Sequence, residues 1–208
     1  MGRLVLTAMV TLDGVHQAPG GPQEDTRDGF DQGGWTVPYA DEDFGRFVDE
    51  VFDRVGAFLL GRRTYEIFAS YWPKITDPAH PIASKLNGLP KYVASSTLTD
   101  PGWAGTTVLD GDLAREVTAL KERIDGELQV HGSGALAQSL LALGLVDTVH
   151  LSAFPVVLGA GRRLFAQGAL PTAFRHTGGR VTAAGVSIQS YDLAGRPEYG
   201  SFELPENA

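Results

Sequence analysis

Two short stretches combine backbone N–H groups with donor side chains in a way suited to binding phosphate. In Gly61-Arg62-Arg63-Thr64, glycine allows a sharp turn, and two guanidiniums and a hydroxyl can close around an anion. The alternative is an ordinary solvated helix start, since surface arginines are common. In Ser95-Ser96-Thr97, the hydroxyls can bind phosphate or cap the next turn. Either stretch alone leaves both interpretations open.

A third stretch, His131-Gly132-Ser133-Gly134-Ala135-Leu136-Ala137, has the form G-x-G-x-x-A, in which missing side chains let a pyrophosphate approach the backbone. A dinucleotide-binding Rossmann unit would also place an acid about 20 residues further on. Ser152-Ala153-Phe154-Pro155 offers none. The sequence therefore argues against a Rossmann unit and leaves pyrophosphate contact open.

Four carboxylates are placed to contact a substrate, and Asp13, Asp41 and Asp43 among them are the candidates for assisting proton transfer. Asp13 follows an apolar run, although Asp13-Gly14 could be only a turn. Asp41, Glu42 and Asp43 open an apolar-periodic segment, where acids also suit the helix dipole. Trp35 and Tyr39 are candidates for stacking on a substrate.

The sequence lacks the residues and motifs that several other kinds of site require. The chain has no cysteine, its five histidines show no ligand spacing, and no G-x-S-x-G or Walker motif occurs, so no metal site is expected. The net charge of -8 disfavours nucleic acid as a partner. No apolar run reaches the roughly 18 residues of a membrane span, and residues 1–12 make a poor signal peptide. We therefore expect a cytoplasmic protein that binds a small molecule.

Strands and helices should alternate along the 208 residues, which suit a single domain spanning residues 1–208. The predicted strands are 4–12, 57–60, 91–95, 127–131 and 146–154, of which 146–154 is half-exposed. An edge strand is predicted within 180–193, with pairing as a hairpin left open. The predicted helices are 41–55, 62–71 and 112–124, and one after residue 134. This pattern predicts an α/β fold with a mainly parallel sheet, helices on both faces and an antiparallel C-terminal edge.

Parallel strands bring their carboxyl ends to one edge, so the three phosphate-binding stretches should converge there. Residues 15–34 have hardly an apolar side chain and are expected to form a mobile lid over that edge. The exposed edge strand 186–193 needs cover, which favours a homodimer.

Taken together, the motifs resemble the dihydrofolate-reductase-like superfamily, and within it the reductase domain of the riboflavin-biosynthesis deaminase-reductase and its stand-alone relatives. The resemblance covers nearly the whole chain and rests on the order of residues 11–14, 59–66, 92–96, 130–134, 143–147 and 155–165. The deaminase signature is absent, since the chain has no cysteine.

The resemblance implies NADPH as reductant. By this likeness Ala8 lies under the nicotinamide carboxamide, and Gly61 to Thr64 bind phosphates. Ser95 and Ser96 lie near the adenosine 2′-phosphate, and Gly132 to Leu136 lie at the pyrophosphate. Two arginines beside hydroxyls favour a 2′-phosphate on charge as well.

The resemblance also bears on the substrate. Residues 35–43 are similar to the Trp-x-x-Pro stretch that precedes the carboxylate of the classical folate enzyme, whereas Ser133 replaces one of its successive glycines. Arg162 and Arg163 could bind a substrate phosphate or lie in a solvated loop. We expect an NADPH-dependent reductase of a pterin-like or aminopyrimidine ribosyl phosphate-like substrate; the alternative is a non-catalytic nucleotide- or flavin-binding module.

Overall fold

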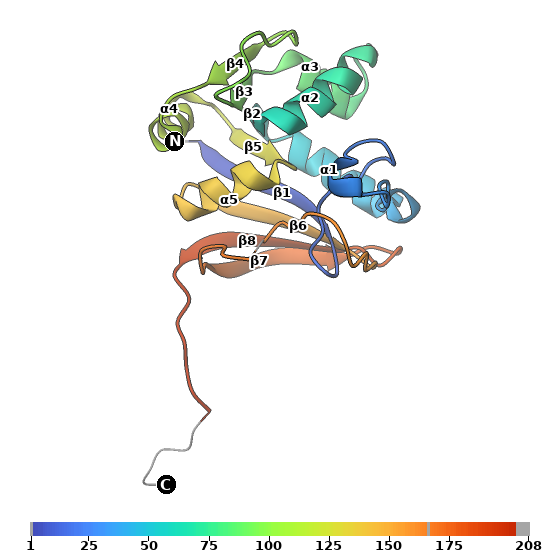
Figure 1. Cartoon of the computed structure of the whole chain (residues 1–208), viewed down its shortest axis with the longest axis vertical. Helices are drawn as coiled ribbons and strands as arrows, with labels where there is room; N and C mark the ends of the chain where they lie inside the picture. The colour runs from blue at the N-terminus through green and yellow to red at the C-terminus, as the bar shows by residue number, and fades with distance from the viewer. Residues whose placement is uncertain (1, 166, 203–208) are drawn as a thin grey trace.

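The computed structural model describes residues 2–165 and 167–202, and an eight-stranded sheet runs through its centre (Figure 1). The strands are β1 (Arg3–Thr11), β2 (Val55–Gly61), β3 (Lys91–Ala94), β4 (Thr106–Leu109), β5 (Glu127–His131), β6 (Thr148–Phe154), β7 (Ala173–Val181) and β8 (Ser187–Gly195). The helices are α1 (Glu42–Phe52), α2 (Arg62–Tyr71), α3 (Pro81–Gly88), α4 (Leu113–Arg123) and α5 (Gly134–Ala142).

The strand order is β4-β3-β2-β5-β1-β6-β8-β7. The first six strands in this order pair in parallel, and β8 runs antiparallel to both β6 and β7. The predicted mainly parallel sheet with an antiparallel C-terminal edge is confirmed. The expectation that residues 186–193 form the uncovered edge was wrong, because β8 lies between two strands and β7 is the edge.

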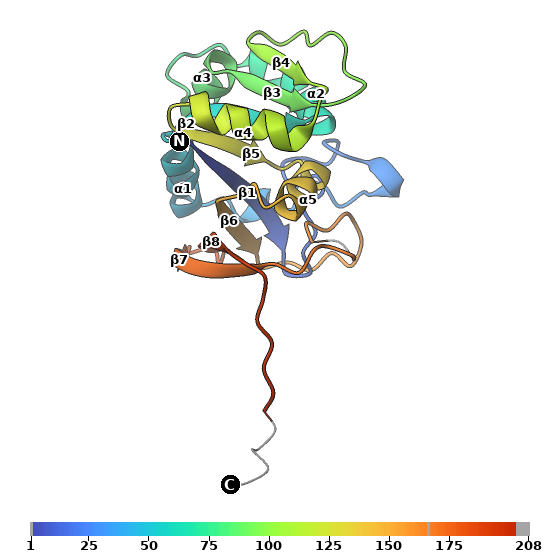
Figure 2. The same cartoon turned by 90° about the vertical axis from the view of Figure 1, so that its left-hand side faces the viewer.

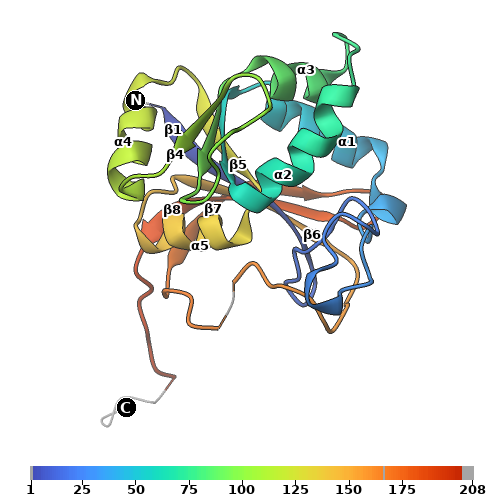
Figure 3. The ribbon, with the colours of Figure 1, turned by 45° about the horizontal axis from the view of Figure 1, so that its top comes forward.

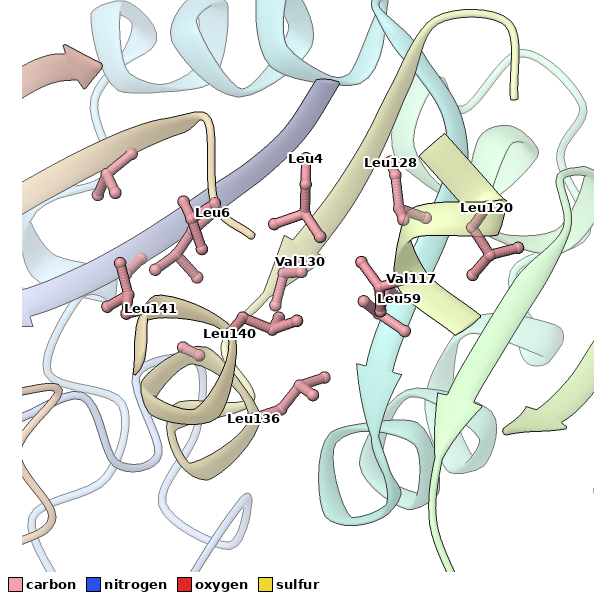
Figure 4. Packing of buried hydrophobic residues seen from close by; sticks show 14 of the residues in the cluster. Leu4, Leu6, Leu59, Val117, Leu120, Leu128, Val130, Leu136, Leu140 and Leu141 are labelled. Carbon is pink, nitrogen blue, oxygen red and sulfur yellow. The ribbon is translucent and has the colours of Figure 1, made fainter. Parts of the chain in front are cut away.

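Helices cover both faces of the sheet, as predicted (Figure 2). On one face, α4 and α5 pack on a cluster rich in leucine from β1, β2 and β5 (Figure 4). On the other face, α1, α2 and α3 pack on aromatic and branched side chains. Burial of these apolar surfaces is the main stabilising contribution to the fold.

The helix boundaries follow local sequence signals. Asp41 precedes α1 and accepts a hydrogen bond from Phe44 N, and Asp112 does the same for Arg115 N before α4. Three elements, α3, β4 and β7, were not predicted. Both α3 and β4 are short, and β4 is an edge strand with little buried surface.

The strand β6 differs from the expected half-exposed strand. Thr148, His150 and Ser152 are buried, whereas Leu151 and Ala153 on the opposite face are only partly buried. The ring of Phe47 in α1 packs on His150 at 5.8 Å between centroids. The polar side of this strand is thus an interior surface, because α1 covers it.

Residues 15–34, predicted to form a mobile lid, contain buried side chains that pack against the rest of the protein, and their mobility stays a prediction. Val15, Gln17 and Phe30 are buried. The indole of Trp35 donates to the carbonyl of Gln17 at 2.8 Å, and Arg162 N donates to the Gln17 amide oxygen at 3.0 Å. Backbone and side-chain hydrogen bonds therefore tie this segment to the loop after β6.

The side-chain amine of Lys91 is buried, and its burial can be tested by the pH dependence of stability. Lys91 is fully buried, and its Nζ donates to the carbonyls of Leu86 and Leu89 at 2.8 Å each, 4.6 Å from the centroid of the Trp103 ring. Burial lowers the pKa of Lys91 to about 8.

In the unfolded chain this amine keeps its proton up to about pH 10. Between about pH 8 and pH 10 the unfolded state therefore binds more protons, and the free energy of unfolding should rise with pH by about 1–3 kcal/mol. Lys91→Met should lack this rise. Denaturant titrations of both proteins at pH 7.5 and pH 10 measure it; equal pH dependence would contradict the assignment.

Candidate functional site

The strand register brings the three predicted phosphate-binding stretches to one edge of the sheet. Gly61 at the end of β2 pairs with Ala94 at the end of β3, directly before Ser95. Thr7 in β1 pairs with His131, so Ala8 lies beside Gly132. The predicted convergence at the carboxyl ends of the strands is present.

Hydrogen bonds join the starts of α2 and α5, which lie side by side in Figure 3. Gly61 N donates to Ser133 Oγ at 3.0 Å, and Ser133 N donates to Thr64 Oγ1 at 3.1 Å. Gly132 and Ser133 both have left-handed backbone, with φ of 58° and 49°. This turn is accessible to glycine but unusual for serine, and the two hydrogen bonds stabilise it.

Neither helix start has a side-chain cap among the described residues. The first N–H groups of α2, from Arg62 to Thr64, and of α5, from Gly134 to Leu136, therefore point out of their helices without intrahelical acceptors. Two such helix ends, with their dipoles, make a site for an anion. A Cβ at Gly132 would make only ordinary contact with Thr64, so glycine is favoured there by its left-handed backbone rather than by lack of space.

Positive charge lies at the start of α2. The side chains of Arg62 and Arg63 are about half exposed, and both guanidiniums lie near Glu66, at 3.4 Å and 3.7 Å. Across the edge, the Ser95 hydroxyl accepts from Thr97 N and Leu98 N, so Ser95 caps a turn. Ser96 is exposed. The arginines are thus accessible to a ligand.

The three candidate acids all have structural partners. Asp13 accepts hydrogen bonds from Thr11 Oγ1 at 2.6 Å, Gly159 N at 2.9 Å and Leu158 N at 3.2 Å. The Thr11 hydroxyl, together with these N–H groups, lowers the pKa of Asp13 to about 2. Asp13 therefore stays ionised and holds the loop after β6.

Asp41 and Asp43 behave similarly. The pKa of Asp41 is lowered by hydrogen bonds from Phe44 N and from Ala184 N, the latter at 2.8 Å. Asp43 forms an ion pair with Arg46. These contacts place both carboxylates at the start of α1, where they support the helix.

The candidate stacking residues differ from each other. Trp35 is buried, with its ring edge-on to Phe154 at 5.5 Å between centroids. Tyr39 is half-buried and lies 6.3 Å from the same ring. Trp35 thus belongs to the core, and only Tyr39 has surface left for a ligand.

One residue at the anion site was not singled out from the sequence. The His16 imidazole lies so close to Gly134 that a methyl group on this glycine would collide with it. Burial lowers the pKa of His16, so its ring is neutral at pH 7. The only sequence signal was its place shortly after β1, in the segment expected to cover the site.

A row of neutral polar side chains adjoins the same edge on the α1 face. Thr7 lies between His131 and His150 in the register, and its buried hydroxyl has no hydrogen-bond partner among the described residues. Burial, with His150 nearby, lowers the pKa of His131 to about 4, so this ring is neutral. Unpartnered buried hydroxyls are costly, which makes Thr7 a candidate ligand contact.

Gln129 determines which nitrogen of His131 carries the proton. Its amide nitrogen donates to Val51 O at 2.7 Å and to Glu127 Oε2 at 2.8 Å. Its oxygen therefore faces His131 Nε2, 3.0 Å away, and can only accept. The proton resides on Nε2, and Nδ1 is left as an acceptor.

A family model described as the RibD C-terminal domain matches residues 3–188. The chain belongs to the RibD C-terminal domain family. This membership confirms the resemblance inferred from the motifs. Among curated proteins, the uncharacterized protein YyaP of Bacillus subtilis (strain 168) is 28% identical over 165 residues, which cover 78% of this chain and 80% of YyaP.

Solved structures share the fold. A putative riboflavin biosynthesis protein from Shewanella sp. PV-4 superposes with a TM-score of 0.69 at 20% identity, covering 93% of this chain and 99% of that one. Dihydrofolate reductase from Enterococcus faecalis, solved with NADP(H), superposes with a TM-score of 0.56 at 13% identity, covering 93% and 97%. The dihydrofolate-reductase-like fold is therefore confirmed.

Two further features of the described residues bear on the site. No helix in them is long and apolar enough to cross a membrane. Within the same residues no group of three or more histidine, aspartate or glutamate side chains is placed to hold a metal ion.

The role of Asp13 is testable. Asp13→Asn replaces an acceptor by an amide that meets two backbone N–H groups, and should lower the free energy of unfolding at pH 7 by about 1–3 kcal/mol. Because the pKa of Asp13 is lowered on folding, its stabilisation is present above about pH 4 and is lost as the pH falls towards 2.

The difference between Asp13→Asn and wild type should therefore shrink at pH 3, as measured by urea denaturation. Asp31→Asn, at an exposed position in residues 15–34, serves as the matched control and should change stability little. A wild-type stability for Asp13→Asn at pH 7 would contradict the structural role.

Proposed function

We propose that the protein is an NADPH-dependent oxidoreductase that reduces a small heterocyclic or carbonyl substrate, pterin-like or similar to an aminopyrimidine ribosyl phosphate, by hydride transfer. The observation that carries this proposal is the pair of uncapped helix starts joined through Thr64 and Ser133 beside two arginines. Membership of the RibD C-terminal domain family supports it. So does the fold shared with a reductase solved with NADP(H).

The residues present fit a dinucleotide. In this proposal the N–H groups of Gly134 to Leu136 and the backbone of Gly132 hold the pyrophosphate, and Ser133 lies beside it and joins the two helix starts. Arg62, Arg63 and the hydroxyls of Ser95 and Ser96 hold the 2′-phosphate. The backbone of Ala8 lies under the nicotinamide carboxamide. NADPH supplies the hydride when bound, and the protein positions it and excludes water.

The three acids considered for proton transfer are held in structural contacts, which leaves the buried neutral row as the polar groups closest to the anion site. We infer that Thr7 Oγ and His131 Nδ1 contact the substrate, the first as donor and the second as acceptor. Both groups are uncharged, so they suit a neutral ring or carbonyl edge and disfavour a bare carboxylate or phosphate at that point. Tyr39 supplies an aromatic contact in this arrangement.

A non-catalytic nucleotide-binding module on the same fold is the second candidate. The structural engagement of Asp13, Asp41 and Asp43 favours it, because a module needs no proton donor. Oxidation of NADPH in the presence of a panel of pterins, aminopyrimidines and enones, followed by absorbance, distinguishes the two. Binding without any oxidation would support the module.

We propose that residues 1–208 act as a single domain, that the protein works in the cytoplasm on a small molecule, and that it forms a homodimer. Its net charge of -8 supports a partner other than nucleic acid.

The cofactor assignment predicts a charge-dependent preference. Wild type should bind NADPH about ten-fold or more tightly than NADH, because charge-assisted hydrogen bonds contribute about 1.5–3 kcal/mol each. The double variant Arg62→Gln/Arg63→Gln should lose that preference with little change in NADH affinity. Isothermal titration measures both constants.

Arg123→Gln, at the far end of α4, removes a positive charge elsewhere on the surface and serves as a control that should keep the preference. Equal affinities of wild type for the two cofactors, or no binding of either, would overturn the proposal.

The role of Thr7 predicts opposite effects on stability and activity. Thr7→Val keeps the shape of the side chain and removes a buried hydroxyl without a partner, so it should raise the free energy of unfolding by about 1 kcal/mol. It should also lower kcat/KM on whichever compound of the panel is reduced, while the Kd for NADPH stays unchanged. A stabilised variant with wild-type kcat/KM would exclude Thr7 as a substrate contact.

A further inference from the structure

The C-terminal residues 196–202 form an arm that leaves the body of the protein. After Gly195 ends β8, the chain runs outward in an extended conformation, as two perpendicular views show (Figures 1 and 2). Tyr199 is 84% exposed, and Phe202 is fully exposed. An arm that holds two aromatic rings in water is unfavourable by itself, because each ring is a large apolar surface.

An apolar groove lies near the point where the arm begins. It has a volume of about 460 Å³ between α5 and the β6–β8–β7 part of the sheet. Its walls include Leu141, Ala142, Leu151, Phe174 and Tyr191. The loop before β7 adds Phe165 and Leu170 at its rim, and both are about half exposed. Such a concave apolar surface is typical of a binding site for large apolar side chains.

The direction of the arm decides whether it can reach the groove of its own chain or only the groove of a second copy. Gly195 pairs with Ala173, so the arm starts at the end of the β7–β8 hairpin and continues away from it. Pro197 favours extended backbone at Arg196 and opposes an immediate reversal. The arm therefore runs away from the body of its own chain and leaves its own groove open.

We propose that the arm of one copy, through Tyr199 and Phe202, binds in the α5–β6–β8 groove of a second copy, and that the second copy returns the same contact. A reciprocal exchange closes with two-fold symmetry, so a dimer leaves neither an arm nor a groove unused. The inference rests on the homodimer of the proposed function and adds the surface that forms it. It is independent of cofactor and substrate.

The first experiment measures the dimer. Wild type should be a dimer by size exclusion with light scattering, and Tyr199→Ser/Phe202→Ser should weaken its Kd about ten-fold or more, since buried aromatic anchors dominate interface affinity. Ala142→Glu, which puts a charge in the groove from an exposed helical position, should do the same. Tyr71→Ser, which removes an exposed aromatic ring on α2, is the control and should leave the dimer intact.

The arm and groove variants should keep the circular dichroism spectrum and NADPH affinity of wild type, which separates loss of the dimer from loss of the fold or of the cofactor site. A monomeric wild type would overturn both the homodimer and the arm exchange. A dimer that none of these variants weakens would overturn the arm exchange alone.

The second experiment identifies which groove the arm occupies. Because the chain has no cysteine, only the introduced cysteines can form a disulfide. A chain with Gly200→Cys is mixed with a chain with Ala142→Cys, and the mixture is oxidised. A disulfide between the two different chains is expected, and Gly200→Cys mixed with Ala119→Cys on α4 should give none. No disulfide in the first mixture would overturn the proposal. So would a chain carrying both cysteines that forms only an internal disulfide, because the arm would then lie in its own groove.

Discussion

The parallel register of β1, β5, β2 and β3 is the constraint on which the site depends. It places Gly61, Ser95 and Gly132 at the same level, so that residues far apart in sequence begin their turns side by side. The hydrogen bonds through Ser133 and Thr64 then fix the starts of α2 and α5 relative to one another. If one strand were shifted by a single residue, both hydrogen bonds would be lost. The side chains of that strand would also point to the opposite face of the sheet.

Charge is distributed unevenly around this edge. The chain is acidic overall, yet its carboxylates near the edge are paired: Glu66 with two arginines, and Asp13 with backbone N–H groups. What the edge presents to a ligand is therefore N–H groups, half-exposed guanidiniums and neutral rings. A phosphate-bearing cofactor and an uncharged reacting group would be complementary to this combination.

Much of the fold was predictable because its signals are local. Strands β2 and β5 and helix α2 have clear periodicity and flanking glycine, proline or capping residues, and the motif order was enough to indicate the family. The short elements α3 and β4 were missed because four to eight residues give little periodicity. The burial of His150 and of residues 15–34 depends on α1 and on the loop after β6, contacts that no local pattern reports.

For the candidate site, the anion-binding part was predictable from the sequence, whereas the roles of the carboxylates and of Thr7 and His131 were not. Glycines and hydroxyls at strand ends indicate an anion site, because their chemistry and their place in a parallel sheet agree. The carboxylates mislead, since a sequence does not show whether an acid accepts hydrogen bonds from its own backbone, as Asp13 and Asp41 do. Thr7 and His131 lie within apolar strands, and only the register reveals that they share a row.

The contacts of Asp13 and Gln17 also limit how this region can change. Asp13 joins the turn after β1 to Leu158 and Gly159, and Gln17 joins the following residues to Arg162. The segment over the site and the loop after β6 are thus two halves of one folded unit. An insertion or deletion in either half would need a compensating change in the other. Relatives that differ in the length of one segment should therefore also differ in the length of the other.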